Sequence, residues 1–460
     1  MKRLACLCVS YVLMSFGGRG ALCQPTQERS QNGHQVERDP FPGESRLSRD
    51  ALVRAVLERN PTIEAARWVW QAGLQREARV TSLDDPTVSY AFAPLSLGAA
   101  EVRYGQRVQL SQRLPYPGKL GLEGEVARAE ADAARYDYQA VRLQLAAMAS
   151  LLFDDYYFAE RALEINGEHT RLLEEFQRIA TVRYVSGLAA QQDPIQAEVE
   201  AAHVLHQDVV LRATRSIIIA QINALLHRLP TARLPPPPPS LDPPETMEAH
   251  ANEPAEHAVS ERPELLARLA EIQARQAEIR LRERDFKPDF EAMTSLDSMW
   301  DEAEHRWMVE LGVNLPIRRG RLRAAVAEAE AALRRVESER LALEDAIRLE
   351  AYTAEHRLQE AAHVVELYRS RLLPASSDQI RAARAGFETG QNSFLALIEA
   401  ERNQRNVELG YQEALTGFYQ RRAELDRALG RIPGLDEDEQ RTSMKKKDDP
   451  RAMALDGGGK

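Results

Sequence analysis

Apolar and polar side chains follow two different periods along this chain, and each period occurs twice. In four short segments apolar residues occupy every second position, which predicts strands with one apolar face. These segments are approximately 86–94, 102–113, 288–296 and 305–315. Two much longer stretches, about 118–186 and 320–388, predict helices. The second stretch places apolar residues at alternating spacings of four and three, which is typical of coiled coils.

The alternation is clearest in the last strand and recurs in the second. In the last strand the apolar face is Trp307, Val309, Leu311, Val313 and Leu315, and the polar face is Arg306, Met308, Glu310, Gly312 and Asn314. In the second strand the polar face is Arg103, Gly105, Arg107, Gln109 and Ser111. Strands of about 9 to 11 residues with this pattern are long enough to cross a bilayer when tilted, with apolar side chains toward lipid. A soluble antiparallel sheet with one wet face produces the same pattern, so the strands alone leave both readings open.

The two halves of the chain share landmarks that are separated by roughly 200 residues. Pro86, before the first strand, corresponds to Pro288, before the third. A Leu-Pro pair followed by glycine and a basic residue occurs at 114–119 and again at 315–321. We therefore predict a duplicated unit of strand, strand, long helix, tight turn and returning helix. The two copies span residues 47–230 and 261–430.

Each long helix is expected to end at a glycine, after which a shorter helix runs back. Gly187 and Gly390 follow the long helices and suit the left-handed conformation that ends many helices. The returning helices are predicted at about 194–228 and 394–429. Pro374 has no backbone N–H, so we expect a kink or a local break in the second long helix.

The remaining segments have the composition of an export signal and of linkers. Residues 1–23 combine two basic residues with a short apolar stretch, which indicates a signal peptide. The flexible N-terminal segment, the proline-rich linker and the disordered tail are predicted at 24–46, 231–260 and 431–460. The three cysteines are Cys6, Cys8 and Cys23. Cys23 is a candidate for lipid attachment, and the alternative is ordinary signal cleavage close to it.

The composition fits long helices and excludes several functional classes. Charged residues make up 28% of the chain with both signs interleaved, the net charge is -10, and no basic block suggests nucleic acid. Beyond the signal segment no run of 18 apolar residues occurs, so no transmembrane helix is predicted. The sequence contains no nucleotide-binding loop, cysteine–histidine metal spacing or nucleophile motif. We therefore predict no enzyme, cofactor or metal site.

Four strands do not close a membrane barrel, because the smallest such barrels have about eight. An open sheet edge in lipid leaves backbone amides unpaired, at a cost of several kcal/mol each. If these strands lie in a membrane, the barrel must be shared between chains: two chains would supply eight strands, and three would supply twelve and a wide lumen.

Several segments resemble the outer membrane efflux protein (TolC) family. They are LSRDALVRAVLERNPTIEAA from residue 47, LSQRLPYPGKL from 110, RYVSGLAAQQD from 183, FKPDF from 286 and FETGQNSFLALIEAERNQ from 387. The resemblance covers residues 47–430 and implies a homotrimer. Its fold would be mainly α with a small β part: a long α-helical coiled-coil barrel in the periplasm, and four strands per chain in a shared β-barrel in the cell outer membrane. Such a channel-tunnel exports cargo that it receives from an inner-membrane pump through a periplasmic adaptor. LPYPGK is similar to members paired with heavy-metal or cation exporters.

The resemblance also implies which residues act. Asp193 and Glu399 fall where acidic side chains line the closed periplasmic gate, although Ala396 stands at a further acidic position of the family. Three carboxylates around a narrow mouth attract cations and repel anions. The alternatives are that Asp193 only caps the helix at Pro194, and that Glu399 lies on a solvated helix face. The adaptor docking tip corresponds to Gly187, Leu188, Ala189, Gly390 and Gln391.

Other polar residues are weaker candidates. The barrel lumen would be lined by Arg103, Arg107, Arg306 and Glu310. These side chains either influence which solutes pass or only make the lumen wall hydrophilic. His203 and His206 share one helix face, but no third metal ligand is near them in the sequence. Asp154 and Asp155 are predicted to be ordinary helix surface and packing.

A soluble periplasmic coiled-coil scaffold or adaptor is the competing interpretation. Such a protein needs neither lipid-facing alternation in both hairpins nor Leu-Pro pairs where the strands end. The strands therefore decide between the two readings. The exported substrate and the partner pump are not specified by the sequence.

Overall fold

The computed structural model describes residues 40–94, 105–244, 260–298, 300 and 303–435. The predicted signal peptide, most of the N-terminal segment, Arg103, and parts of the linker and the tail lie outside these residues. The chain divides into two compact units, 1–42 and 43–460. Every described helix and strand belongs to the second unit.

The first repeat begins with two capped helices. Its elements are α2 Arg49–Arg59, α3 Pro61–Val80, β1 Thr87–Ala93, β2 Gly105–Leu114, α4 Lys119–Val185 and α5 Gln192–Leu225. The Ser48 hydroxyl accepts a hydrogen bond from the Ala51 N–H and caps α2. The Asn60 side chain accepts one from the Thr62 N–H at 2.9 Å and caps α3. These bonds satisfy amides that a helix leaves unpaired at its start.

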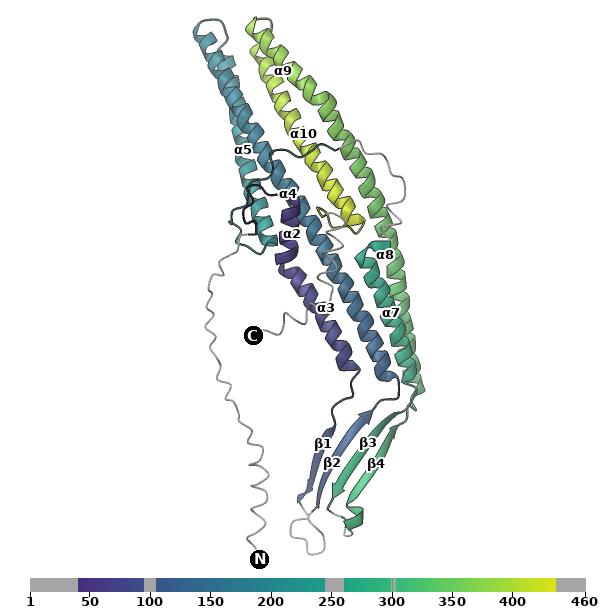
Figure 1. The fold of residues 1–460 in the computed structure, drawn as a ribbon. Helices are drawn as coiled ribbons and strands as arrows, with labels where there is room; N and C mark the ends of the chain where they lie inside the picture. Colours follow the sequence, from purple (N-terminus) through teal and green to yellow (C-terminus); the bar gives the residue numbers. More distant parts are fainter. Residues whose placement is uncertain (1–39, 95–104, 245–259, 299, 301–302, 436–460) are drawn as a thin grey trace, which may run out of the picture. The chain divides into compact units, whose positions relative to one another are not determined.

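The second repeat has the same order of elements. It contains α7 Pro263–Arg284, β3 Asp289–Asp297, the 3-10 turn η2 Ala303–His305, β4 Trp307–Asn314, α8 Arg319–Leu367, the π-helical turn η3 Tyr368–Leu372, α9 Leu373–Glu388 and α10 Phe394–Ala428. The sheet lies at one end of α3, α4, α7 and α8, and the turns after α4 and α9 lie at the opposite end (Figure 1). The predicted fold class, mainly helical with one small sheet and an internal duplication, is confirmed.

The four strands form one antiparallel sheet in the order β1-β2-β3-β4. Tyr90 lies opposite Val108, and Val108 lies opposite Leu296, which in turn lies opposite Trp307. This register places the apolar positions of all four strands on the same face, because side chains directly opposite each other share a face. The other face collects the polar positions, as the sequence alternation predicts.

The second long helix is interrupted near Pro374, as predicted. Tyr368–Leu372 widens into a π-helical turn between α8 and α9. A proline removes one backbone donor and its ring collides with the carbonyl four residues earlier, here that of Ser370. A π turn at that carbonyl relieves the collision and lets the two helical segments continue. In contrast, α4 passes through Gly167 without a break over 67 residues, a length of about 100 Å.

The helices pack side by side with small and aliphatic side chains between them. Helix α4 contacts α3, α5, α7 and α10, and α8 contacts α7 and α10. Nine alanines of α4 are among its buried residues, which allows close approach of neighbouring helices. Along α8 the positions with four- and three-residue spacing include buried Leu322, Ala329, Val336 and Ile347.

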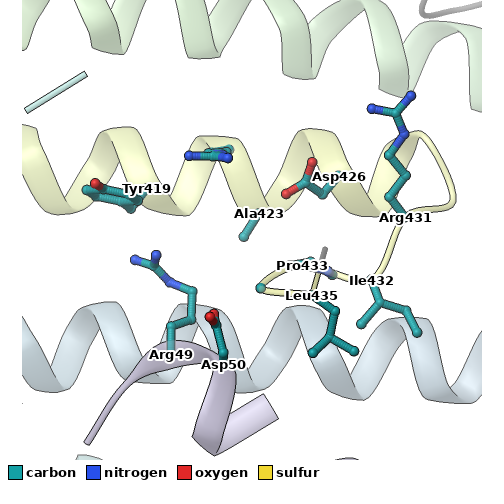
Figure 2. A pocket seen from close by; sticks show the side chains of 11 residues that line it. Arg49, Asp50, Tyr419, Ala423, Asp426, Arg431, Ile432, Pro433 and Leu435 are labelled. Atoms are coloured by element: carbon teal, nitrogen blue, oxygen red, sulfur yellow. The ribbon is translucent and has the colours of Figure 1, made fainter. Parts of the chain in front are cut away.

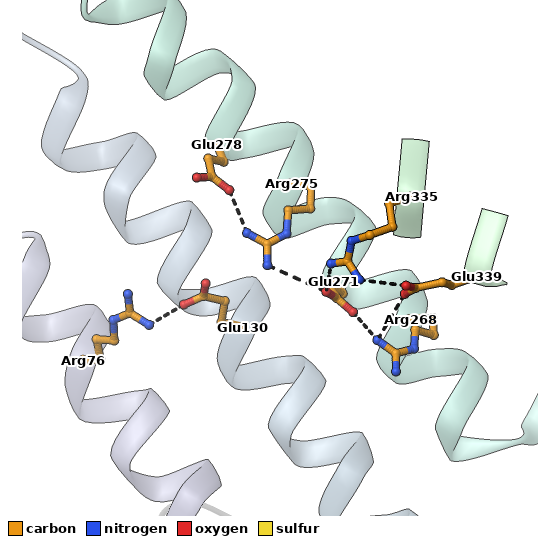
Figure 3. A network of polar contacts seen from close by, with 8 residues as sticks. All are labelled: Arg76, Glu130, Arg268, Glu271, Arg275, Glu278, Arg335 and Glu339. Carbon is orange, nitrogen blue, oxygen red and sulfur yellow. Dashed lines mark hydrogen bonds and ion pairs between the residues drawn. The ribbon is translucent and has the colours of Figure 1, made fainter. Parts of the chain in front are cut away.

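Ion pairs cover the seam between α7 and α8. Glu271 on α7 binds Arg268 at 2.5 Å and lies 3.7 Å from Arg275 on the same helix and 3.9 Å from Arg335 on α8 (Figure 3). Arg335 also pairs with Glu339 at 2.7 Å. Exposed pairs of this kind contribute about 0 to 1 kcal/mol each, so they position the seam more than they stabilise it.

The described part of the proline-rich linker lies against the helices. The Pro236 carbonyl accepts a hydrogen bond from the Leu47 N–H at 2.8 Å. The Tyr419 hydroxyl of α10 donates to the Asp242 carbonyl at 2.8 Å. Among the described residues no helix is long and apolar enough to span a membrane.

Candidate functional sites in the sheet and the helical turns

The apolar face of the sheet is uncovered in the single chain. Val88 of β1 is 69% exposed, and Leu311 of β4 is 77% exposed. The same face exposes Tyr90, Phe92, Val108, Leu110, Phe290, Leu296, Trp307, Val309 and Val313. A contiguous apolar surface of this extent marks a site of contact with lipid or with another protein.

An ion pair joins two strands on the polar face. Arg107 on β2 pairs with Asp297 on β3 at 2.7 Å, and the Asp297 side chain is almost fully buried. Glu310 lies on the same face of β4, since it is opposite Met293. Arg306 was predicted inside the last strand, but β4 begins at Trp307. The Arg306 guanidinium donates instead to the Trp300 carbonyl at 3.1 Å.

The two outer strands leave backbone groups available for pairing. Strand β1 pairs with β2, and β4 pairs with β3, but β1 and β4 do not pair with each other in the described chain. An unpaired strand edge readily adds another strand through backbone hydrogen bonds. The four-stranded sheet is therefore an open segment with two free edges.

Both helical turns use glycine in the left-handed conformation. Gly187 has φ 72° and Gly390 has φ 76°. After α4, the Leu188 N–H donates to the Arg183 carbonyl at 2.8 Å. After α9, the Gln391 N–H donates to the Gly386 carbonyl at 2.8 Å. These bonds satisfy the last carbonyls of each helix, so the paired glycines end the long helices as predicted.

Contacts between the two turns hold them side by side. The Arg183 guanidinium donates to the Phe387 carbonyl at 3.0 Å and lies 4.5 Å from the centre of the Phe387 ring. Phe387 also packs on Phe394, with ring centres 5.4 Å apart. Below them a buried apolar cluster joins Leu173, Phe176, Ala180, Ala197, Val204, Ala383, Leu397, Ile398 and Ala400. Arg183 was not predicted as a site residue, because nothing in its local sequence identifies a partner about 200 positions away.

The predicted gate and tip residues lie at these turns. Asp193 is the second residue of α5, which begins at Gln192, so it does not occupy the capping position before the helix. Glu399 is exposed in the second turn of α10. Leu188 is 71% exposed, and Ala189 lies beside it in the connection between α4 and α5. The structure places these residues near one end of the helices.

A buried polar network lies behind the turns. His169 on α4 is 2% exposed, and its Nδ1 and Nε2 lie 2.7 Å from Glu401 and 3.0 Å from Glu408 on α10. Burial lowers the pKa of His169, but the hydrogen bonds to both carboxylates outweigh burial and raise the pKa to about 9. The imidazolium therefore donates to both glutamates and joins α4 to α10. Nearby, Glu200 on α5 binds Arg402 and lies 3.7 Å from Arg405.

A second buried pair involves Asp154, which was predicted to belong to helix surface and packing. Asp154 is fully buried on α4 and pairs with Arg49 of α2. The Arg49 guanidinium also lies 4.4 Å from the centre of the Tyr419 ring. Burial outweighs the nearby guanidinium and raises the pKa of Asp154 to about 7. Arg49 and Tyr419 border a cavity of about 340 Å³ that Asp426 also lines (Figure 2).

The described residues offer no cluster of three or more histidine, cysteine or acidic side chains arranged for a metal. His203 and His206 lie exposed on α5.

Residues 255–431 match the sequence profile of the outer membrane efflux proteins. This match covers the second structural repeat, from α7 to α10. The cobalt-zinc-cadmium resistance protein CzcC of Cupriavidus metallidurans is 27% identical over 142 residues. That match covers 30% of the present chain and 33% of CzcC, so the chain spans about a third of the length of this relative.

Solved outer-membrane channels have the same fold. OprN superimposes with a TM-score of 0.72 and 18% sequence identity, covering 86% of this chain and 92% of OprN. CusC gives a TM-score of 0.72 with 16% identity, covering 83% of this chain and 92% of CusC. The resemblance to the outer membrane efflux proteins that the sequence indicated is confirmed by the profile match, and these structures show the fold.

Proposed function

We propose that this efflux-family chain is one subunit of a homotrimeric channel in the cell outer membrane. The channel is a passive duct of a tripartite efflux system. It receives small molecules or metal cations from an inner-membrane pump through a periplasmic adaptor and releases them outside the cell. In this arrangement the helices project into the periplasm and the sheets of three chains form one barrel. The chain performs no catalysis in this role.

The main observation that supports this proposal is the uncovered apolar face of a sheet that has two free edges. Leu311 and Val88, at opposite edges, expose more than two thirds of their surface. In lipid these side chains are favourably placed, and the polar face forms a wet lumen. The free edges require pairing with other chains, since unpaired backbone groups are not tolerated in lipid. Three chains would bring twelve strands, enough for an open lumen.

Metal cations are the proposed cargo class. The support is the similarity to CzcC, whose name describes resistance to cobalt, zinc and cadmium. CusC is a second similar channel by fold. Export assays with cobalt, zinc and cadmium salts, comparing cells with and without the chain and its pump, test this cargo. Equal sensitivity to all three salts in both strains would contradict it.

The gate of the channel is proposed at Asp193 and Glu399. Both carboxylates lie at the turns, and three copies of each around a narrow mouth would attract cations. In planar bilayers, the double variant Asp193→Ala, Glu399→Ala should lose cation preference. Glu198→Ala, an exposed change on the same helix α5, is the matched control and should conduct like the unmodified channel. Unchanged cation preference in the double variant would refute this gate.

The adaptor is proposed to dock on the two turns. Leu188 and Val185 are 71% and 80% exposed there, so the first turn offers apolar contact surface. Ala189 adds a small side chain, and Gly390 and Gln391 form the second turn. Leu188→Asp should abolish adaptor cross-linking in cells while the channel still conducts. Cross-linking at the normal level would exclude this docking site.

The proposed lumen contacts are Arg107 and Glu310 on the polar face, with Arg306 just before β4 and Arg103 outside the described residues. Because Arg107 is already paired with Asp297, Glu310 has more freedom to meet a passing ion. Glu310→Gln should change single-channel conductance if the lumen selects ions. An identical conductance would mean that these side chains only wet the wall.

The proposed function itself is tested by reconstituting the purified chain in planar bilayers. Stable single-channel steps are expected. A soluble periplasmic scaffold, the competing function, predicts no conductance and no extraction into detergent. The exposed apolar sheet face argues against that alternative, because a soluble scaffold would place it in water.

A further inference from the structure

We infer that Asp84 and Asp85 of one copy bind Arg318 and Arg321 of the neighbouring copy. The contact accompanies pairing of β1 of the first copy with β4 of the second. This inference rests on the proposed function, because it requires the sheet to be shared between copies. The inference names the residues that determine which strand edge of the neighbouring copy is bound.

The two free edges are compatible with each other. Strand β1 leaves the helices and β4 returns to them, so these edges are antiparallel when copies stand side by side in the same orientation. Pairing them continues one sheet. Tyr90 of β1 and Leu311 of β4 both lie on the apolar face, so the face can continue across the junction. The start of β1 and the end of β4 then meet at the helix end of the sheet.

The acidic partner is the segment before β1. Asp84 and Asp85 lie between α3 and Pro86, and both are exposed. The Asp84 carbonyl accepts a hydrogen bond from the Gln112 amide at 2.8 Å, which fixes the backbone beside β2. Neither carboxylate forms an ion pair with another described residue. Two adjacent negative charges are thus held at the β1 edge without an ion-pair partner among the described residues of their own chain.

The basic partner lies where β4 enters α8. A cavity of about 560 Å³ opens there, lined by basic Arg113, Lys119, Arg282, Lys287, Arg318 and Arg321 and by acidic Asp285 and Asp289. Both acids bind Lys119, at 3.2 Å and 2.9 Å. The exposed guanidinium groups of Arg318 and Arg321 form no ion pair with a described residue. The cavity therefore carries surplus positive charge beside a free strand edge.

The internal duplication contains a related contact within the chain, in which the acids Asp285 and Asp289 align with Leu83 and Thr87, which flank Asp84 and Asp85. Lys119 follows Gly118 in the first repeat, and Arg321 follows Gly320 in the second. Lys119 binds Asp289, across the junction where β2 of the first repeat meets β3 of the second. The corresponding junction of β4 lies between copies. There Arg321 stands at the position of Lys119, and Asp84 and Asp85 lie one and two residues from the positions that correspond to Asp285 and Asp289.

Charge pairs at an interface rim act mainly on partner choice and association, and like charges brought together are unfavourable. Reversing one side of the contact should therefore prevent assembly, and reversing both sides should restore it. The edges of a single chain are opposite in charge, so the contact runs head to tail, and it forms a ring when the rotation between neighbouring copies closes.

A charge-swap experiment tests the inference in the full chain. Detergent-extracted protein is analysed by native mass spectrometry for the fraction that is trimeric. Asp84→Arg with Asp85→Arg should lower that fraction about tenfold, as should Arg318→Asp with Arg321→Asp. The quadruple variant should return to within about twofold of the unmodified protein. If the quadruple variant assembles no better than the double variants, or if the double variants assemble normally, the inference is wrong.

Disulfide cross-linking tests the same junction with the native charges in place. The only cysteines lie at positions 6, 8 and 23, so the strands offer a clean background. Ser89 and Asn314 both lie on the polar face near the helix end of their strands. Ser89→Cys with Asn314→Cys should produce a band of three linked chains on a non-reducing gel. Ser89→Cys with Val313→Cys, whose side chain points to the opposite face, should not.

The outcomes separate this inference from the proposed function. If the unmodified chain conducts in bilayers but the Ser89–Asn314 pair does not cross-link, the inference fails and the channel proposal stands. If cross-linked trimers form from a chain that does not conduct, the channel proposal fails. A band of two linked chains alone would show a closed dimer and would overturn the trimeric arrangement.

Discussion

Removing the charge of His169 should weaken the contact between α4 and α10 in a way that depends on pH. The pKa of His169 is raised from 6.5 to about 9, and each unit corresponds to about 1.4 kcal/mol, so protonation stabilises the fold by about 3 kcal/mol. The side chain is 2% exposed, which leaves little solvent screening. Because the folded pKa lies above the unfolded value, this stabilisation is complete below pH 6.5 and is lost as the pH rises through 9.

The assay compares urea unfolding of the unmodified protein and of His169→Gln in one detergent, followed by far-ultraviolet circular dichroism between pH 6 and pH 10. The free energy of unfolding that is lost through His169→Gln, relative to the unmodified protein, should be about 3 kcal/mol larger at pH 6 than at pH 10. His206→Gln, at an exposed position on α5, is the control and should show no such change. A difference for His169→Gln that stays constant across this range would refute an imidazolium bound by Glu401 and Glu408.

Three further substitutions test other parts of the structure. Leu311→Arg on the apolar sheet face should destabilise a membrane-inserted sheet by about 2 to 4 kcal/mol, whereas Ser295→Arg on the polar face should have little effect. Urea titration in liposomes measures the free energy of unfolding of both variants. Equal effects of the two substitutions would contradict a lipid-facing sheet. Leu397→Ala in the cluster below the turns should cost about 2 to 5 kcal/mol, measured by urea unfolding, because Leu397 is 2% exposed and the surrounding helices leave a cavity. Gly386→Ala should lower the free energy of unfolding by about 1 to 3 kcal/mol in the same measurement, because an added Cβ would lie 2.2 Å from the Asn392 side chain. Adding Asn392→Ala to this variant should recover most of the lost stability.

The fold was predictable because its signals are local and repeated. The alternation around Leu311 gave the correct strand faces, and Pro374 predicted the interruption that appears as a π-helical turn. Gly187 and Gly390 have the left-handed conformation that a helix end requires. Each of these features depends on a few neighbouring residues, so a single sequence is enough to find it.

Long-range partners were not predictable in the same way. Asp154 was predicted only as helix surface and packing, and its buried partner Arg49, a residue 105 positions earlier, was not identified. His169 finds Glu401 across 232 positions, and no periodic pattern identifies such a pair. The start of α5 at Gln192 also differs from the expected start after Asp193, since a proline is accepted within the first turn of a helix.

The gate and the docking tip remain proposals that the turns support. Arg183 and Phe387 hold the two turns together, and the buried His169 network lies behind them. Any opening at this end must therefore move α4 and α10 together or break these contacts. This expectation follows from side chains that the sequence did not single out, because their importance depends on which helices become neighbours.

The most direct test of a shared membrane sheet is the mass of the native protein extracted from outer membranes by mild detergent. The account predicts a complex of three chains, found in the outer-membrane fraction and absent from the soluble periplasm. A single chain recovered in the soluble fraction would contradict it, because the exposed apolar face and the two free strand edges would then have no partner.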